Sequence, residues 1–240
     1  GGRVPFIERT KAGRDKIGSR DSRIEMRSSN DLLVWSEPRL LLDGRTVAQA
    51  SDGLPKPRLS YPRLVSAEGG YRLYFGASKV MLEDSGESTT RYVCSAFAHE
   101  IGGPYVMESV GSMLESIPND AWRNLGCGNL TVLPGPGGYA AVQSGAYWDE
   151  KRRSSASALV HLASEDGKSW RLGENCRMLV PAEKGWASRY ITSCDIRYKA
   201  EEECWYCYFS ATGDTASPVR HESIGLLIGK DPSLLKTVRS

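Results

Sequence analysis

Hydrophobic residues occur along this chain in short runs, either continuous or alternating with polar residues. No window keeps the 3.6-residue period of an amphipathic helix. Glycine and proline, present 25 and 12 times, interrupt the runs at short intervals. Short runs bounded by turn-forming residues are typical of β-strands. The pattern therefore predicts an all-β protein.

Four of these runs end in a turn that carries an acidic residue. The acidic residues are Asp31, Glu100, Asp166 and Asp231, which follow one another at intervals of 69, 66 and 65 residues. The strand-like runs that precede them lie at 23–27, 92–97, 158–162 and 224–228. Asp, Glu and Gly can each nucleate a turn at such a place. The regular interval indicates an internal structural repeat.

Between successive turns, a second pair of runs predicts a β-hairpin. The first strands of these hairpins are expected at 61–65, 129–133 and 194–198, and the aromatic-rich second strands at 71–75, 139–142 and 205–209. Tight turns at 68–70, 136–138 and 201–203 join them. Together with the turn-marked third strand, each repeat is a four-stranded antiparallel meander.

One meander cannot bury both of its faces, whereas sheets stacked around an axis can, so the repeat predicts a β-propeller of four-stranded blades. We expect a single domain over 1–240, with units at about 1–50, 60–115, 128–180 and 193–240. The first unit lacks an innermost strand, which suggests that part of the N-terminal region is absent from this chain. A two-sheet sandwich is the alternative, but it gives no reason for a regular repeat.

Charge and cysteine content narrow the functional classes. The formal net charge is only +2, so nothing favours nucleic acid or an anionic membrane as a partner, and no apolar run is long enough to span a bilayer. The six cysteines are too sparse for a disulfide scaffold, which favours a reducing, cytoplasmic location, although a removed signal peptide would leave no trace. Cys204 and Cys207 form a CxxC spacing, but residues three apart on a strand point to opposite faces. We therefore expect no cofactor, with a channel Ca²⁺ left open.

The long polar connections predict where a site would lie. Antiparallel order places the starts of the first and third strands at one end of the propeller, together with the connections at 43–60, 78–90, 115–128, 145–155, 181–193 and 211–221. Functional residues concentrate where long loops are held by a rigid scaffold. We therefore expect a ligand at this end of the central channel.

Several side chains at that end are candidates for ligand binding. They are Tyr61, Arg63, Asn129 and Arg197 on innermost strands, Arg220 and His221 before a third strand, and Trp148 and Trp186 in connections. The tryptophans could form platforms for sugar rings, although a tryptophan near a strand end is more often part of the core. His221, beside Glu222, could take part in acid/base chemistry or could cap the loop.

Asp195 is the sharpest individual candidate. It is expected at the start of an innermost strand, where the equivalent units have Pro62 and Leu130, so the repeat does not require a carboxylate there. An ionised carboxylate facing a crowded channel needs a partner or a task. The alternative to a catalytic role is an ion pair with Arg197, Arg189 or Arg220.

These motifs resemble those of the five-bladed β-propeller glycosidases, which include arabinofuranosidase/xylosidase, invertase and mannoside-phosphorylase-like enzymes. The resemblance rests on the strand opening at 61–65, the Gly-Gly-Tyr-Arg-Leu-Tyr-Phe run at 69–75, the Ser-x-Asp-Gly-x-x-Trp turn at 164–170, Ser-x-Asp-Leu at 29–32 and the run at 222–225. It covers most of the chain and implies five blades.

The resemblance implies a carbohydrate-active enzyme of glycoside hydrolase type, with a carbohydrate as its ligand. Such enzymes use two carboxylates, and Asp195 matches one by position, with Glu222 as the second candidate. The inner strands offer Pro62 and Asn129 where another carboxylate would be expected. The surrounding cations would also suit a glycoside phosphorylase. The same fold could instead serve as a catalytically silent glycan-binding propeller or as a protein-binding scaffold.

Overall fold

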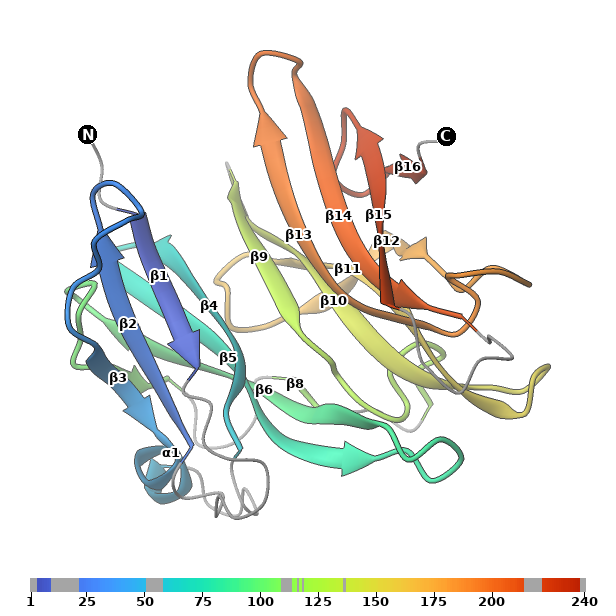
Figure 1. Cartoon of the computed structure of the whole chain (residues 1–240), viewed down its shortest axis with the longest axis horizontal. Helices are drawn as coiled ribbons and strands as arrows, with labels where there is room; N and C mark the ends of the chain where they lie inside the picture. Colours follow the sequence, from blue (N-terminus) through green and yellow to red (C-terminus); the bar gives the residue numbers. More distant parts are fainter. Residues whose placement is uncertain are drawn as a thin grey trace. The chain divides into compact units, whose positions relative to one another are not determined.

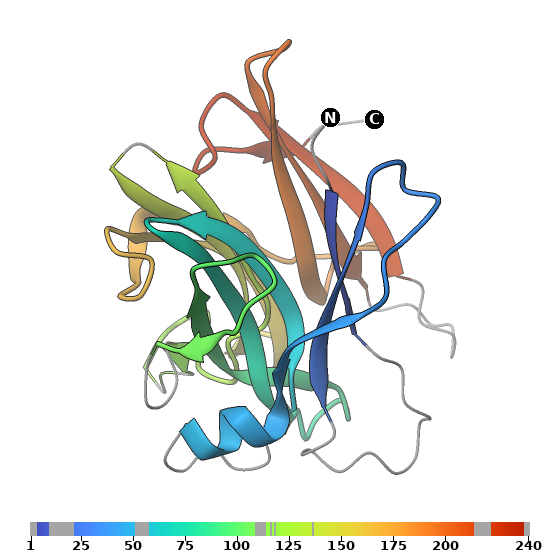
Figure 2. The same cartoon turned by 90° about the vertical axis from the view of Figure 1, so that its left-hand side faces the viewer.

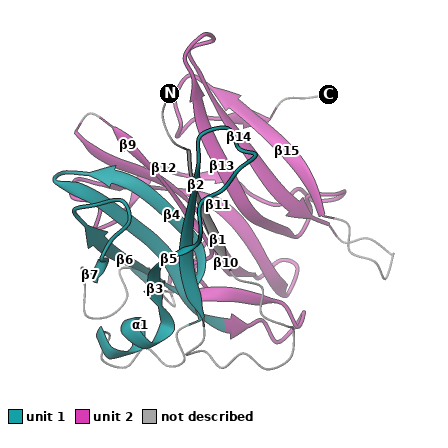
Figure 3. Cartoon of the chain, turned by 60° about the vertical axis from the view of Figure 1, so that its left-hand side comes forward, with its two compact units in different colours: residues 1–79, 92–114 teal, residues 80–91, 115–240 magenta. Residues whose placement is uncertain are grey.

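The computed structural model describes residues 4–9, 22–50, 58–108, 114–115, 117, 119–135, 137–213 and 222–237. The chain forms two compact units, shown in separate colours in Figure 3. Unit 1 comprises residues 1–79 and 92–114, and unit 2 comprises residues 80–91 and 115–240. Each is described by itself below.

Unit 1 contains two antiparallel sheets and a short helix. The first sheet has the order β1 (Val4–Arg9), β2 (Arg23–Ser29), β3 (Arg39–Asp43). The second has the order β4 (Ser60–Ala67), β5 (Gly70–Met81), β6 (Ser88–Ala98), β7 (Val106–Met107), with β8 (Leu114–Glu115) also pairing with β6. The ends of β5 and β6 that meet at the 82–87 turn belong to unit 2. Helix α1 (Gly44–Ala50) follows β3 directly, as Figure 2 shows.

The sequence explains these elements locally. Asp43 Oδ1 accepts a hydrogen bond from the amide of Thr46 at 2.7 Å, which caps the first turn of α1, and Val47 is buried against the core of unit 1. On β5, Leu73 and Phe75 are fully buried in the same core. This helix lies in a segment that the sequence pattern assigned to a polar connection.

Unit 2 contains two four-stranded sheets (Figure 1). The first has β9 (Leu130–Gly135), β10 (Gly138–Asp149), β11 (Ser154–Ser164) and β12 (Arg171–Leu179). The second has β13 (Tyr190–Lys199), β14 (Cys204–Thr212), β15 (Glu222–Gly229) and β16 (Lys236–Thr237). In both, consecutive strands are neighbours and antiparallel, as a meander requires.

The two sheets of unit 2 pack on each other through an apolar core and a set of hydroxyl groups. Val142 and Leu159 of the first sheet share the core with Ile196, Cys207 and other residues of the second. Hydroxyls of the first sheet donate hydrogen bonds to carbonyl oxygens of β13: Thr131 to Cys194 at 3.0 Å, and Ser144 and Ser157 to Ile191 at 2.6 and 2.9 Å. The register of β13 shifts between Ile191 and Ser193. The irregularity leaves the Ile191 carbonyl for these hydroxyls.

The turns predicted at Asp31, Asp166 and Asp231 are present and are organised by side chains, whereas in the turn at Glu100 the main-chain carbonyl accepts the amide of Gly103 at 2.9 Å. Ser29 Oγ and Asp31 Oδ1 accept hydrogen bonds from the amides of Leu32, Leu33 and Val34 at 2.8 to 2.9 Å. The turn after β11 repeats the arrangement: Ser164 and Asp166 accept bonds from the amides of 167–169 at 2.7 to 2.8 Å. Asp231 likewise accepts the amide of Ser233 at 2.7 Å. The three aspartates therefore have a defined structural role.

Three expectations about strand limits were wrong. Strands β5 and β6 reach to Met81 and back from Ser88, and β10 and β11 are joined by residues 150–153, so the connections expected at 78–90 and 145–155 are short turns. β13 begins at Tyr190, because Ile191 is buried and Tyr190 pairs with Thr212. Asp195 thus lies in the middle of this strand, not at its start.

The expected fold class is confirmed. Four antiparallel sheets follow one another along the chain, and α1 is the single helix among the residues that the structure describes. Among the described residues, the first sheet has three strands and each of the others has at least four. This is the blade pattern of a β-propeller.

Candidate functional site

Glu222 lies at the end of the last sheet where β13 and β15 begin. Its Oε1 atom accepts a hydrogen bond from Thr192 Oγ1 at 3.0 Å and another from the Ser210 hydroxyl, so residues of three adjacent strands meet at this carboxylate. Among the described residues, no hydrogen bond reaches its Oε2 atom, and the side chain is exposed. A carboxylate with one oxygen held and the other open to solvent can exchange a proton with a ligand.

Asp195 forms an ion pair with Arg197 on the same strand. The distance from Arg197 Nε to Asp195 Oδ2 is 3.0 Å, and the side chains of Arg197 and Asp195 are 70% and 47% exposed. This ion pair is one of those that the sequence analysis gave as the alternative to a catalytic role for Asp195. An exposed pair of this kind contributes little to stability, about 0–1 kcal/mol. Both side chains are accessible in part, although the Oδ1 atom of Asp195 is buried.

The strand register separates Asp195 from Glu222. Asp195 is opposite Tyr208 on β14, whereas Glu222 is opposite Thr212, four residues further along. Four residues span about 13 Å and two strand spacings about 10 Å, so the two Cα atoms lie roughly 16 Å apart. Paired glycosidase carboxylates are about 5–9.5 Å apart. The two candidates therefore do not form one such pair by direct proximity.

The other unit 2 candidates differ in their accessibility. Trp186 stacks on Phe209, with ring centroids 5.7 Å apart and an interplanar angle of 15°, yet stays 45% exposed, so it packs on one side and offers surface on the other. Trp148 is half-buried on β10, and its amide donates to Asn124 at 2.9 Å. Asn129 is buried, and its Oδ1 has no hydrogen-bond partner among the described residues. Such an acceptor is usually satisfied by water or a ligand.

A polar network that the sequence did not reveal lies at the end of unit 2 where β13 begins. Asp84 Oδ2 accepts the amide of Ser155 at 2.8 Å and lies 3.3 Å from Arg189, and Ser155 Oγ is 2.6 Å from the Tyr190 hydroxyl. Burial opposes ionisation of Asp84, but its hydrogen bonds to Ser155 and the charge of Arg189 outweigh this, so its pKa lies below the usual value. Asp84 reaches Ser155 and Arg189 across 71 and 105 positions of sequence, which no local motif signals.

In unit 1, the first strand of the second sheet carries an unusual backbone. Tyr61 has a φ of 51°, in the left-handed region that non-glycine residues seldom adopt, and its side chain is 48% exposed. The pairing register of β4 with β5 shifts between Ser60 and Arg63, so the irregular part of β4 includes Tyr61. Strain of this kind is often found at functional sites, so both Tyr61 and Arg63 stay candidates for ligand contact.

The remaining candidates lie outside what the structure covers. Arg220 and His221 are not among the described residues. Across the described part of the chain, no group of three or more His, Cys, Asp or Glu side chains could hold a metal ion, and no helix is long and apolar enough to cross a membrane.

Comparisons with known proteins address the fold. No protein-family model matches the sequence, and no curated protein sequence matches it. Solved structures do. A glycoside hydrolase matches over 99% of this chain and 70% of its own, with a TM-score of 0.66 and 12% identity. A family 117 glycoside hydrolase from the marine bacterium Zobellia galactanivorans matches over 90% and 55%, with a TM-score of 0.62 and 15% identity.

A third similar structure is the family 32 β-fructofuranosidase of Bombyx mori, solved as a mutant in complex with sucrose. It matches over 99% of this chain and 46% of its own, with a TM-score of 0.63 and 13% identity. At such low identity, these likenesses concern the fold alone. The chain thus has the β-propeller fold of glycoside hydrolases, as its turn and strand motifs indicated.

Proposed function

We propose that this chain is a carbohydrate-active enzyme of the glycoside hydrolase type, which cleaves a glycosidic bond at the end of the sheets where β13 and β15 begin. One observation supports the proposal beyond the fold: Glu222 has one oxygen fixed by the hydroxyls of Thr192 and Ser210, while no hydrogen bond from the described residues reaches the other oxygen. This anchoring fixes the direction in which the carboxyl group can exchange a proton.

In this proposal, Glu222 is the residue that transfers a proton during bond cleavage. Hydrolysis needs a proton on the leaving oxygen and a water molecule, activated by a second carboxylate, at the anomeric carbon. Because about 16 Å separate their Cα atoms, Asp195 does not supply that second carboxylate beside Glu222. We assign Asp195 and Arg197 to hydrogen bonding with sugar hydroxyls, and the exposed ring of Trp186 to stacking against a sugar face.

The test is the substitution Glu222→Gln, assayed with nitrophenyl glycosides of arabinose, xylose, galactose and fructose. The amide oxygen can still accept both hydroxyl bonds, so the sheet is preserved and only proton transfer is lost. A fall in kcat of about a hundredfold or more is expected. The matched control is Glu203→Gln, an exposed carboxylate at the far end of the same sheet, which should change kcat by less than about twofold.

Full turnover by Glu222→Gln would contradict the assignment. Asp195→Asn separates the second role: it should raise KM more than it lowers kcat, because it weakens ligand orientation but leaves the proton donor in place. Sugar binding measured by calorimetry, without product from any of the glycosides, would instead support a catalytically silent glycan-binding propeller.

A further inference from the structure

A cavity lies in unit 2 at the hairpin end, away from Glu222. Its volume is about 400 Å³, within the range of small-molecule sites. It is lined by Leu133, Pro134, Gly135, Gly137, Gly138, Tyr139, Ala140, Ala163, Ser164, Glu165, Arg171, Trp205 and Pro232. Trp205 pairs with Gly229, whereas Thr212 pairs with Glu222, so seven residues of β14, roughly 24 Å, separate this cavity from the carboxylate. It is a distinct place on the molecule.

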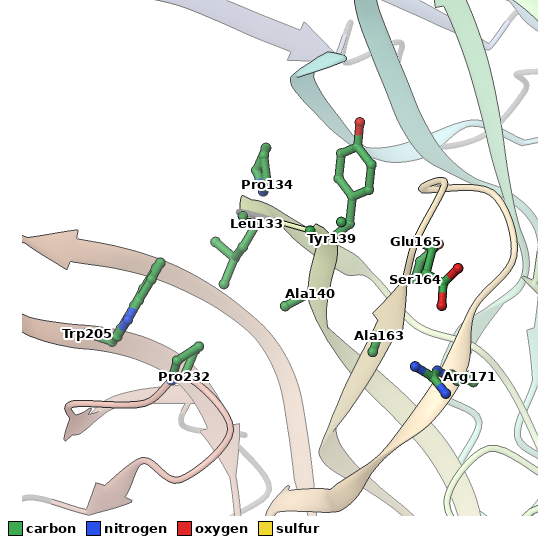
Figure 4. A pocket seen from close by; sticks show the side chains of 13 residues that line it. Leu133, Pro134, Tyr139, Ala140, Ala163, Ser164, Glu165, Arg171, Trp205 and Pro232 are labelled. Atoms are coloured by element: carbon green, nitrogen blue, oxygen red, sulfur yellow. The ribbon is translucent and has the colours of Figure 1, made fainter. Parts of the chain in front are cut away.

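The cavity has an apolar side and a polar side. Figure 4 shows Trp205 and Pro232 on one side, with Glu165 and Arg171 on the other and the small side chains of Ala140 and Ala163 between them. The Trp205 ring is half-buried and contacts Tyr198, with centroids 5.2 Å apart. Its position is therefore fixed by packing. A flat aromatic surface held in this way suits a ligand that presents C–H groups.

The polar side selects against a charged ligand. Glu165 and Arg171 are both exposed at the rim and have opposite charges, so a simple anion or cation would meet one group of its own sign. A neutral molecule with adjacent hydroxyl groups could accept hydrogen bonds from the guanidinium and donate them to the carboxylate. Gly137 and Gly138 also line the cavity, and because they have no side chains their main-chain groups are accessible to a ligand.

The glycines of the β9–β10 turn are required by its geometry. Gly137 and Gly138 have φ values of 104° and 138°, which side-chain-bearing residues rarely adopt. A Cβ atom on Gly138 would lie 2.5 Å from the carbonyl oxygen of Ser164. The β9–β10 turn is thus held close to the end of β11, and this contact fixes the shape of the cavity wall.

We infer that this cavity is a binding site for a neutral sugar unit, separate from the place of bond cleavage. The inference rests on the proposed function only for the class of ligand, since the cavity itself is defined without Glu222. A second sugar site at the far end of the sheets would hold one part of a polysaccharide substrate while another part is cleaved.

The test is fluorine NMR of the full chain labelled with 5-fluorotryptophan. The chain has six tryptophans, and each gives its own fluorine resonance. Trp205 is assigned through the variant Trp205→Phe. Cellobiose, xylobiose, lactose and sucrose are then added at millimolar concentration. With at least one of them, the Trp205 resonance should shift to saturation. The variant Arg171→Ala should weaken that affinity about tenfold, as expected for loss of a hydrogen bond to a charged group.

The controls separate this inference from the proposed function. Lys168→Ala removes a cation from the turn between β11 and β12 that does not line the cavity, and it should change the affinity by less than about twofold. Glu222→Gln should leave the Trp205 response intact. If no sugar shifts the Trp205 resonance, or if only Trp148 or Trp186 responds, the inference is overturned even where the proposed activity holds. A shift unchanged by both Arg171→Ala and Glu165→Gln would overturn it as well.

Discussion

The turns after β2 and β11 are built from the same side chains and share one left-handed backbone position, but different residues occupy that position. In each, a serine hydroxyl and an aspartate carboxylate accept the amides of the next residues at nearly equal distances. The residue after the aspartate is left-handed in both: Leu32 has a φ of 64°, and Gly167 a φ of 70°. Glycine adopts this conformation freely, whereas leucine does not.

The comparison shows that the serine and aspartate determine the turn, because the turn forms even where its left-handed position is occupied by a leucine, Leu32. It also shows where variation is permitted. In the turn of unit 1, Leu33 and Val34 are 84% and 74% exposed, while in unit 2 the corresponding turn contributes Ser164 and Glu165 to the cavity wall. The serine and aspartate positions are shared by the two turns, whereas the surroundings of the turns differ.

The largest effect is expected from removing the aspartate. Asp166→Ala leaves the amides of Lys168 and Ser169 without their charged acceptor and should destabilise unit 2 by about 2 kcal/mol, a value already reduced for solvent exposure. Calorimetry should show a fall in Tm of roughly 2–4 °C per kcal/mol. Asp31→Ala should lower the stability of unit 1 instead. Equal stability of Asp166→Ala and the parent chain would show that the aspartate does not impose the turn.

Exchanging the left-handed residues should give shifts of opposite sign. Gly167→Leu places a side chain in the left-handed region and should cost about 1–2 kcal/mol. Leu32→Gly relieves that strain but adds freedom to the unfolded chain, so a net gain of about 0.5–1 kcal/mol is expected. Urea unfolding followed by fluorescence can measure both. Two shifts of the same sign would mean that packing, not backbone conformation, decides these positions.

The smallest effect is a dependence on pH. Hydrogen bonds from the amide of Ser169, then that of Lys168, outweigh burial and lower the pKa of Asp166 from 3.8 to about 2. A carboxylate with a lowered pKa stabilises the fold above pH 4, and this contribution is lost as the pH falls toward 2. Because the group is exposed, the loss should be under about 1 kcal/mol. The parent chain should lose more stability over this range than Asp166→Asn does, and parallel curves would contradict the assignment.

The fold was predictable because the repeat recurs in turn residues whose chemistry is local. Asp31 and Asp166 act on amides two and three residues ahead, so a short motif contains the whole interaction. The limits of the strands were harder to predict from the sequence. The local pattern places Tyr190 and Ile191 in a connection, because their strand position depends on pairing with Thr212 and Ala211 across the sheet.

The candidate site was predictable only in part. Asp195 stands out as a departure from the repeat, and the sequence also pointed to its ion pair with Arg197. The hydroxyls that hold Glu222 were not predictable, because Thr192 and Ser210 reach it only through strand register. Asp84 and Arg189 are 105 residues apart, and nothing in either local sequence indicates the other.

The hydroxyl groups that join the two sheets of unit 2 have a mechanical consequence. Apolar contacts have no preferred direction, whereas the hydroxyls of Thr131, Ser144 and Ser157 donate to specific carbonyl oxygens of β13. A shift of one residue would break all three bonds at once and leave the carbonyls buried. These hydrogen bonds therefore fix the two sheets in one relative position. A force applied along β13 would have to break all three contacts together before the strand could move.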